Sequence, residues 1–100
     1  MNLYEVCDKV MEIEGGLLHG EISFEYDNLM SAMKCGHPMI ILDDIIANIF
    51  WDVRADKEPS DDAIKKTLSG LKDFRCAFGV KELDEVINGL EGYIAEKGIA

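Results

Sequence analysis

The chain has 100 residues and a formal net charge of −10, and 48% of its residues are hydrophobic and 30% charged. This length and composition indicate one globular domain, residues 1–100, with enough apolar side chains for a core, and they exclude a disordered chain. The acidic excess repels nucleic-acid phosphates, so we expect no direct DNA or RNA binding and instead a protein partner with a basic surface.

The negative charge is concentrated in the first part of the chain. Residues 1–62 hold 14 acidic and four basic side chains, whereas residues 63–100 hold six of each kind. The longest apolar run, residues 39–42, is far shorter than a bilayer span, and the first residues have no basic stretch or small-residue cleavage site. Three widely spaced cysteines fit reduced thiols better than disulfides. We therefore expect a cytoplasmic protein without a membrane segment.

The first predicted helix begins at Asn2, which can form a capping box with Glu5. Apolar residues then recur at the spacing of a buried helical face: Leu3, Val6, Cys7, Val10 and Met11. The glycines at 15 and 16 are expected to end this helix. Three acids, Glu5, Asp8 and Glu12, recur together on the opposite face.

A second helix is predicted to start between residues 21 and 23, after a short connection. Its apolar positions continue the helical spacing: Ile22, Tyr26, Leu29, Met30 and Met33. Gly36 suits the left-handed position that follows a helix. The next segment would then begin at Pro38, a residue favoured in the first turn of a helix.

The most apolar segment, residues 38–54, is predicted to be the central helix of a bundle. Its core stripe is broad: Met39, Leu42, Ile45, Ile46, Ile49, Phe50 and Val53. A helix that is apolar over so wide an arc needs neighbours that cover it. The consecutive isoleucines at 40 and 41 leave a short buried strand over residues 39–42 as an alternative, but the helical spacing continues to Val53.

Two further helices are predicted in the last part of the chain. Ser60 can cap the fourth, and Gly79 can close it. Its buried positions would be Ile64, Leu68, Leu71, Phe74 and Phe78. The fifth runs from about residue 80 to residue 97 and is preferred over a hairpin at Asn88 and Gly89, since the helical spacing continues through that pair. The predicted fold class is therefore all-α, a compact bundle of four to five helices.

Neither a metal site nor a catalytic site has the residue spacing that it would need. The candidate zinc ligands are one C-x-H pair and three scattered residues: Cys35, His37, Cys7, His19 and Cys76. Carboxylates on two helices can hold Mg²⁺, as in all-helical nucleotide pyrophosphohydrolases, but this chain has Glu5-x-x-Asp8 and no E-x-x-E. We predict no metal, no cofactor and no catalytic residue.

A second stripe on the segment 38–54 is the preferred functional candidate. Ile40, Ala47 and Trp51 lie away from its core stripe, beside Asp43 and Asp44. Either another helix of the bundle covers them, or they form an exposed apolar patch rimmed by acids, which is the anatomy of a protein-binding hot spot. The predicted partner-binding residues are Trp51, Ile40, Ala47, Asp43, Asp44, Glu5, Asp8 and Glu12.

These features favour a small protein-binding module that acts stoichiometrically as an inhibitor. Nucleic-acid mimics, anti-CRISPR and other anti-defence proteins, and nuclease immunity proteins share this size and charge, a likeness of composition and not of sequence. The alternative is a homodimeric helical accessory subunit or chaperone, with the second stripe buried in an isologous interface. The third hypothesis is a metal-dependent nucleotide hydrolase that would need Asp8 or Asp44.

Overall fold

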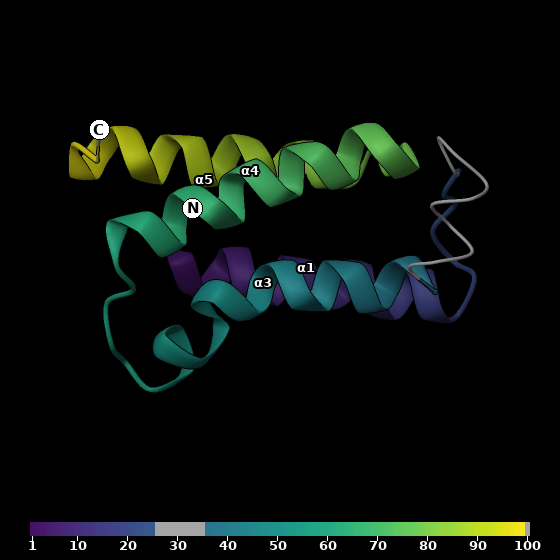
Figure 1. Cartoon of the computed structure of the whole chain (residues 1–100), viewed down its shortest axis with the longest axis horizontal. Coiled ribbons are helices and arrows are strands. Elements are labelled where there is room, and N and C mark those ends of the chain that lie inside the picture. The colour runs from purple at the N-terminus through teal and green to yellow at the C-terminus, as the bar shows by residue number, and fades with distance from the viewer. Residues whose placement is uncertain (26–35, 100) are drawn as a thin grey trace.

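The computed structural model describes residues 1–25 and 36–99, and within them it contains four α-helices. These are α1 (Leu3–Leu18), α3 (Pro38–Arg54), α4 (Asp61–Phe78) and α5 (Leu83–Lys97). α1 packs against α3 and α5, and α4 packs against the same two helices. Figure 1 shows that consecutive helices run antiparallel, with α1 and α3 forming one half of the bundle and α4 and α5 the other. The predicted all-α bundle is confirmed.

Three predicted capping residues, Asn2, Ser60 and Gly79, stand at helix ends as expected. The Asn2 side chain accepts a hydrogen bond from the Glu5 N–H at 2.8 Å, and the Glu5 carboxylate accepts one from the Asn2 N–H at 3.2 Å, which is a complete capping box. The Ser60 hydroxyl accepts the Ala63 N–H at 3.1 Å. Gly79 and Gly98 follow α4 and α5 in left-handed conformations, with φ of 64° and 67°.

Each helix contributes one apolar face to a single core. The fully buried side chains include Val6, Val10 and Leu17 from α1, Leu42, Ile46 and Ile49 from α3, Ile64 and Leu71 from α4, and Leu83, Val86 and Leu90 from α5. The halves approach closely where α3 meets α4, because a Cβ at Gly70 would lie only 2.8 Å from Ile45 Cγ2. The shared core and the close approach of α3 to α4 together hold the two halves of the bundle in place.

The segment 38–54 is helical throughout, so the alternative of a strand at residues 39–42 is wrong. Of its predicted core stripe, Leu42, Ile46, Ile49 and Val53 are buried, while Met39, Ile45 and Phe50 are partly buried. The predicted central position is not confirmed. α3 has two helical neighbours, as every other described helix has, so it occupies one corner of the bundle.

α1 differs from the prediction at two points. It continues through the glycines at 15 and 16 to Leu18, because Leu17 is buried and the missing side chain of Gly16 leaves room for Ile22. A Cβ at Gly16 would lie 2.5 Å from Ile22 Cδ1. Met11 was predicted to be buried and is exposed, because Ile13 and Leu17 complete the core face instead.

The second predicted helix is not observed at its start, since residues 21–25 are not helical. Its remaining predicted positions lie outside the described residues. Gly36 has the predicted left-handed backbone, with φ of 77°. α5 begins at Leu83, later than predicted, and passes through Asn88 and Gly89 without interruption, so the hairpin alternative is wrong.

Candidate functional site

The second stripe of α3 points away from the core. Trp51 is 71% exposed and Ile40 is 52% exposed, and Ala47 between them is exposed as well. Of the two alternatives for this stripe, cover by another helix and exposure, the structure has exposure. Trp51 is the only tryptophan in the chain, and it rests edge-on against Phe50, with ring centroids 5.0 Å apart and planes at 89°.

A matching stripe on α1 was missed by the sequence analysis. Tyr4, Met11 and Leu18 are exposed and recur every seven residues, which places them within 40° of one another around the helix. The signal was present in the sequence, but Met11 had been assigned to the core and Leu18 to a connection. We call the six side chains of the two stripes the outer α1/α3 face: Tyr4, Met11, Leu18, Ile40, Ala47 and Trp51.

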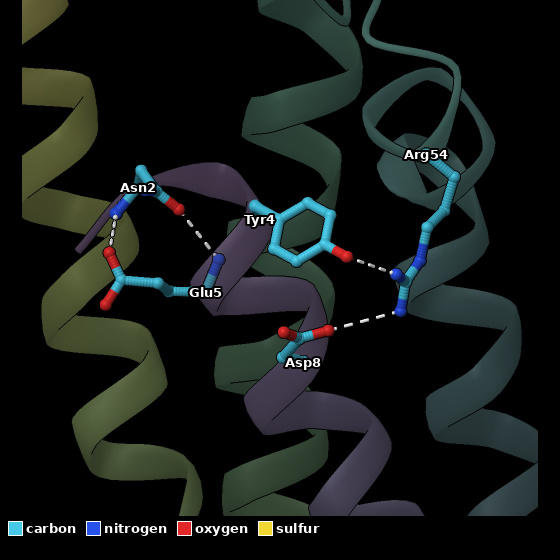
Figure 2. A network of polar contacts seen from close by, with 5 residues as sticks. All are labelled: Asn2, Tyr4, Glu5, Asp8 and Arg54. Atoms are coloured by element: carbon cyan, nitrogen blue, oxygen red, sulfur yellow. Dashed lines mark hydrogen bonds and ion pairs between the residues drawn. The ribbon is translucent and has the colours of Figure 1, made fainter.

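Arg54 fixes how these two stripes align. Its guanidinium reaches from the end of α3 to α1, where it donates hydrogen bonds to the Tyr4 hydroxyl at 2.7 Å and to the Asp8 carboxylate at 3.1 Å (Figure 2). The guanidinium carbon also lies 4.9 Å from the Tyr4 ring centroid and 5.1 Å from that of Phe50. An exposed ion pair contributes at most about 1 kcal/mol, so the main effect of this network is geometric.

From this anchor, the rise of an antiparallel helix pair sets the rest of the alignment. Seven residues advance a helix by about 10.5 Å, and α1 and α3 run antiparallel (Figure 1). A residue seven positions later in α1 therefore lies beside a residue seven positions earlier in α3, and we call each such pair a level. The three resulting levels, each about 10.5 Å from the next, are Tyr4 with Arg54, Met11 with Ala47, and Leu18 with Ile40. The contact between Glu14 and Asp43 falls in the same alignment and supports it independently.

The predicted acids of α1 do not form a free cluster. Glu5 belongs to the capping box, and Asp8 pairs with Arg54. Glu12 lies 3.9 Å from Lys9 in an exposed pair on its own helix. Of these three acids, only Asp8 therefore borders the outer α1/α3 face, while Glu12 and Lys9 line a pocket shared with Glu82 and Glu85 beside α5.

The two predicted acids of α3 differ in their surroundings. Asp44 is exposed on the outer surface. Asp43 is also exposed, but it faces α1 and shares a hydrogen bond with Glu14. Asp43 therefore contributes to the seam between the two helices as well as to the acidic border.

Glu14 is a buried acid that the sequence analysis did not single out. Only 6% of its surface is exposed, and its Oε1 has no hydrogen-bond partner in the structure. Burial raises the pKa of Glu14 to about 8, and the charge of Asp43 and the hydrogen bond with it act in the same direction. At neutral pH the Glu14 carboxyl is therefore protonated and bonded to the Asp43 carboxylate. Its position on the core arc of α1, between Val10 and Leu17, was the available signal.

The described residues contain no group of three or more His, Cys, Asp or Glu side chains arranged to hold a metal ion. His37 uses its Nδ1 to accept the Met39 N–H at 3.0 Å, as the cap of α3. Cys7 is buried, and burial raises the pKa of its thiol to about 11, while Cys76 is exposed. The predicted pair member Cys35 lies outside the described residues.

Across residues 1–25 and 36–99, no helix is both long and apolar enough to cross a membrane. Comparison with protein-family models, with curated proteins and with solved structures gives no match to this chain.

Proposed function

We propose that this protein is a small acidic binding module that acts stoichiometrically, as an inhibitor, on a partner protein with a basic surface. One observation carries the proposal. The helices α1 and α3 hold every large apolar side chain that is exposed on the four described helices, and these side chains form the outer α1/α3 face. Contiguous exposed apolar surface with polar borders is typical of protein-binding sites.

The charge around this face favours a basic partner over a second copy of the chain. Asp8, Asp43 and Asp44 border the apolar stripes, and the cation Arg54 offsets only Asp8, so the two acids of α3 leave the border negative. Two copies joined through this face would bring two acidic borders together, whereas a basic partner would neutralise them. Trp51 is the expected anchor, since tryptophan is enriched among the residues that dominate binding energy.

Within this class, an inhibitor that occupies a nucleic-acid-binding groove fits the charge best. Such a groove is basic, and the acidic border of the face would replace the phosphates that normally lie there. A nucleic-acid mimic of the anti-CRISPR, anti-defence or nuclease-immunity type is the form of the proposal that we favour. Its binding should weaken as salt rises, because exposed charge pairs are screened.

The first experiment is to determine the oligomeric state of the wild type and of Trp51→Arg by light scattering after gel filtration. We expect both to be folded, because Trp51 is exposed, and both to be monomers, because two copies joined through this face would bring their acidic borders together. A wild-type dimer that Trp51→Arg converts to a folded monomer would replace our proposal with the homodimeric accessory-subunit hypothesis.

The second step uses three immobilised proteins: wild type, Trp51→Arg and Asn88→Arg. Asn88 is exposed on α5, so the control adds the same side chain on the other half of the bundle. A partner should be retained by wild type and by Asn88→Arg but not by Trp51→Arg, and the purified complex should weaken at high salt. Equal retention by all three proteins, or an affinity that salt does not change, would contradict the proposal.

A further inference from the structure

We infer that the element that binds the outer α1/α3 face is a single amphipathic α-helix of the partner with basic residues on its flanks. This inference rests on the proposed function and specifies the structure that the partner presents. The helix would lie along the seam between α1 and α3, parallel to their axes. Three features of the face support it: the spacing of its levels, two small residues along it and the acids beside its stripes.

The spacing of the levels matches a helix and not a strand. Successive levels lie about 10.5 Å apart, which is the rise of seven residues of an α-helix. A helix with apolar residues in a heptad pattern therefore meets Tyr4, Met11 and Leu18 in turn. On one face of a strand, side chains recur about every 6.6 Å, so a strand would fall out of step after the first level.

Two small residues leave room for close approach along the face. A Cβ placed on Gly15, between Met11 and Leu18 on α1, would meet no atom within 4 Å, and Ala47, which faces Met11 from α3, is small and exposed. Larger side chains stand at both ends, with Trp51 near one end and Leu18 and Ile40 at the other. Small residues let helix axes approach, while the larger side chains at the ends interdigitate with those of an incoming helix.

Acids lie beside both stripes of the face. Asp8, paired with Arg54, follows the stripe of α1, and Asp44 follows that of α3. In helical assemblies of this kind, charged residues beside the apolar seam set partner choice and orientation. Lysine or arginine on one flank of the incoming helix would pair with Asp44, and on the other flank it would compete with Arg54 for Asp8, whereas a second copy of α1 or α3 would add further acids.

The single tryptophan allows the inference to be tested directly by fluorescence. The probe is a synthetic peptide of about 21 residues, or three heptads, with leucine at the apolar heptad positions, lysine elsewhere and no aromatic residue. We expect a saturable blue shift of the Trp51 emission as the peptide covers this side chain. A second peptide of the same composition, with its leucines at every second position of one continuous stretch and lysine elsewhere, should bind at least about tenfold more weakly.

Two matched variants locate the site without removing the reporter. Ala47→Arg places a cation at the centre of the outer α1/α3 face, and Ala95→Arg places the same cation at an exposed alanine of α5. Both keep Trp51 and change the net charge equally. The helical peptide should bind Ala47→Arg at least about tenfold more weakly than wild type, and Ala95→Arg with little change.

Equal affinity for the two peptides would overturn the inference, because binding would then follow charge and not helical spacing. Equal weakening by Ala47→Arg and Ala95→Arg would overturn it as well. If the immobilised wild-type protein retains a Trp51-dependent, salt-sensitive partner but the helical peptide causes no shift, the proposed function stands and the inference of a helix fails. If the wild-type protein retains no such partner and the helical peptide causes no shift, the proposed function and the inference of a helix are both wrong.

Discussion

The two halves of this bundle meet the same core with similar inner faces, but their outer faces differ. α4 and α5 are joined on the outside by ion pairs, Lys72 with Glu91 at 3.4 Å and Arg75 with Asp84 at 2.9 Å. Among the described residues, neither helix exposes a large apolar side chain. α1 and α3 expose five, and a buried carboxylic acid lies in the seam between them.

This difference distinguishes the apolar surface that the fold requires from the apolar surface that it does not require. A helix in a bundle requires one apolar face and is most soluble when the rest is polar, which describes α4 and α5. A second apolar stripe adds nothing to the core and increases the tendency to associate. Because α1 and α3 each carry such a stripe, their outer surface is the region where function is expected.

The largest expected effect concerns the inner faces, where the halves should be equivalent. Leu42 of α3 and Leu71 of α4 are both fully buried, so Leu42→Ala and Leu71→Ala should each lower the free energy of unfolding by about 2–5 kcal/mol. Urea denaturation followed by circular dichroism measures both. If one variant lost less than about 1 kcal/mol and the other unfolded, the halves would not share one core.

The next effect concerns the seam between α1 and α3, and it depends on pH. The folded-state pKa of Glu14, about 8, lies above its ordinary value of 4.5. Stability from this group is therefore fully present below about pH 4.5 and lost as the pH rises toward about 8, at up to about 1.4 kcal/mol per pH unit. Glu14→Gln stays neutral and can still donate to Asp43, so it should be more stable than wild type by about 2–3 kcal/mol at pH 7. The gain should shrink toward acid.

The seam between α4 and α5 provides the control, because its pH dependence has the opposite sign. The hydrogen bond from Arg75, with its charge, lowers the pKa of Asp84. Stability from this pair is present at neutral pH and lost as the pH falls through the folded-state value. Asp84→Asn should therefore destabilise the protein slightly at neutral pH and not in acid.

The same pH series tests Glu14. A gain in unfolding free energy from Glu14→Gln that did not grow between about pH 5 and pH 8 would show that Glu14 is ionised in the folded protein.

The local features of the fold were predictable, and the features that depend on neighbours were not. The caps at Asn2 and Ser60 depend on three or four consecutive residues, so their pattern was sufficient. The end of α1 was predicted wrongly because helix continuation through Gly16 depends on the packing of Ile22, which follows in a separate segment.

The candidate site was half predictable for the same reason. The stripe of α3 was found because Trp51 stands out against a saturated core arc. Met11 lies near the edge of the core arc of α1. It could not be assigned to the core or to the surface without knowing on which sides of α1 the other helices pack. Glu14 showed the reverse problem: it lies on the core arc of α1, but an ionisable side chain is expected at the surface, and the packing of α3 on α1 shows that it is buried.

The smallest expected effect is that of Trp51→Arg on stability, and the comparison of the two outer faces depends on it. Trp51→Arg removes the edge contact with Phe50 but no core contact, and it adds a cation to an acidic protein. Its free energy of unfolding should therefore lie within about 1 kcal/mol of wild type, as should that of Asn88→Arg. Thermal unfolding of the two variants beside wild type measures this. A much larger loss of unfolding free energy for Trp51→Arg alone would mean that Trp51 stabilises the fold. Its exposure would then be no evidence that the outer α1/α3 face is a binding surface.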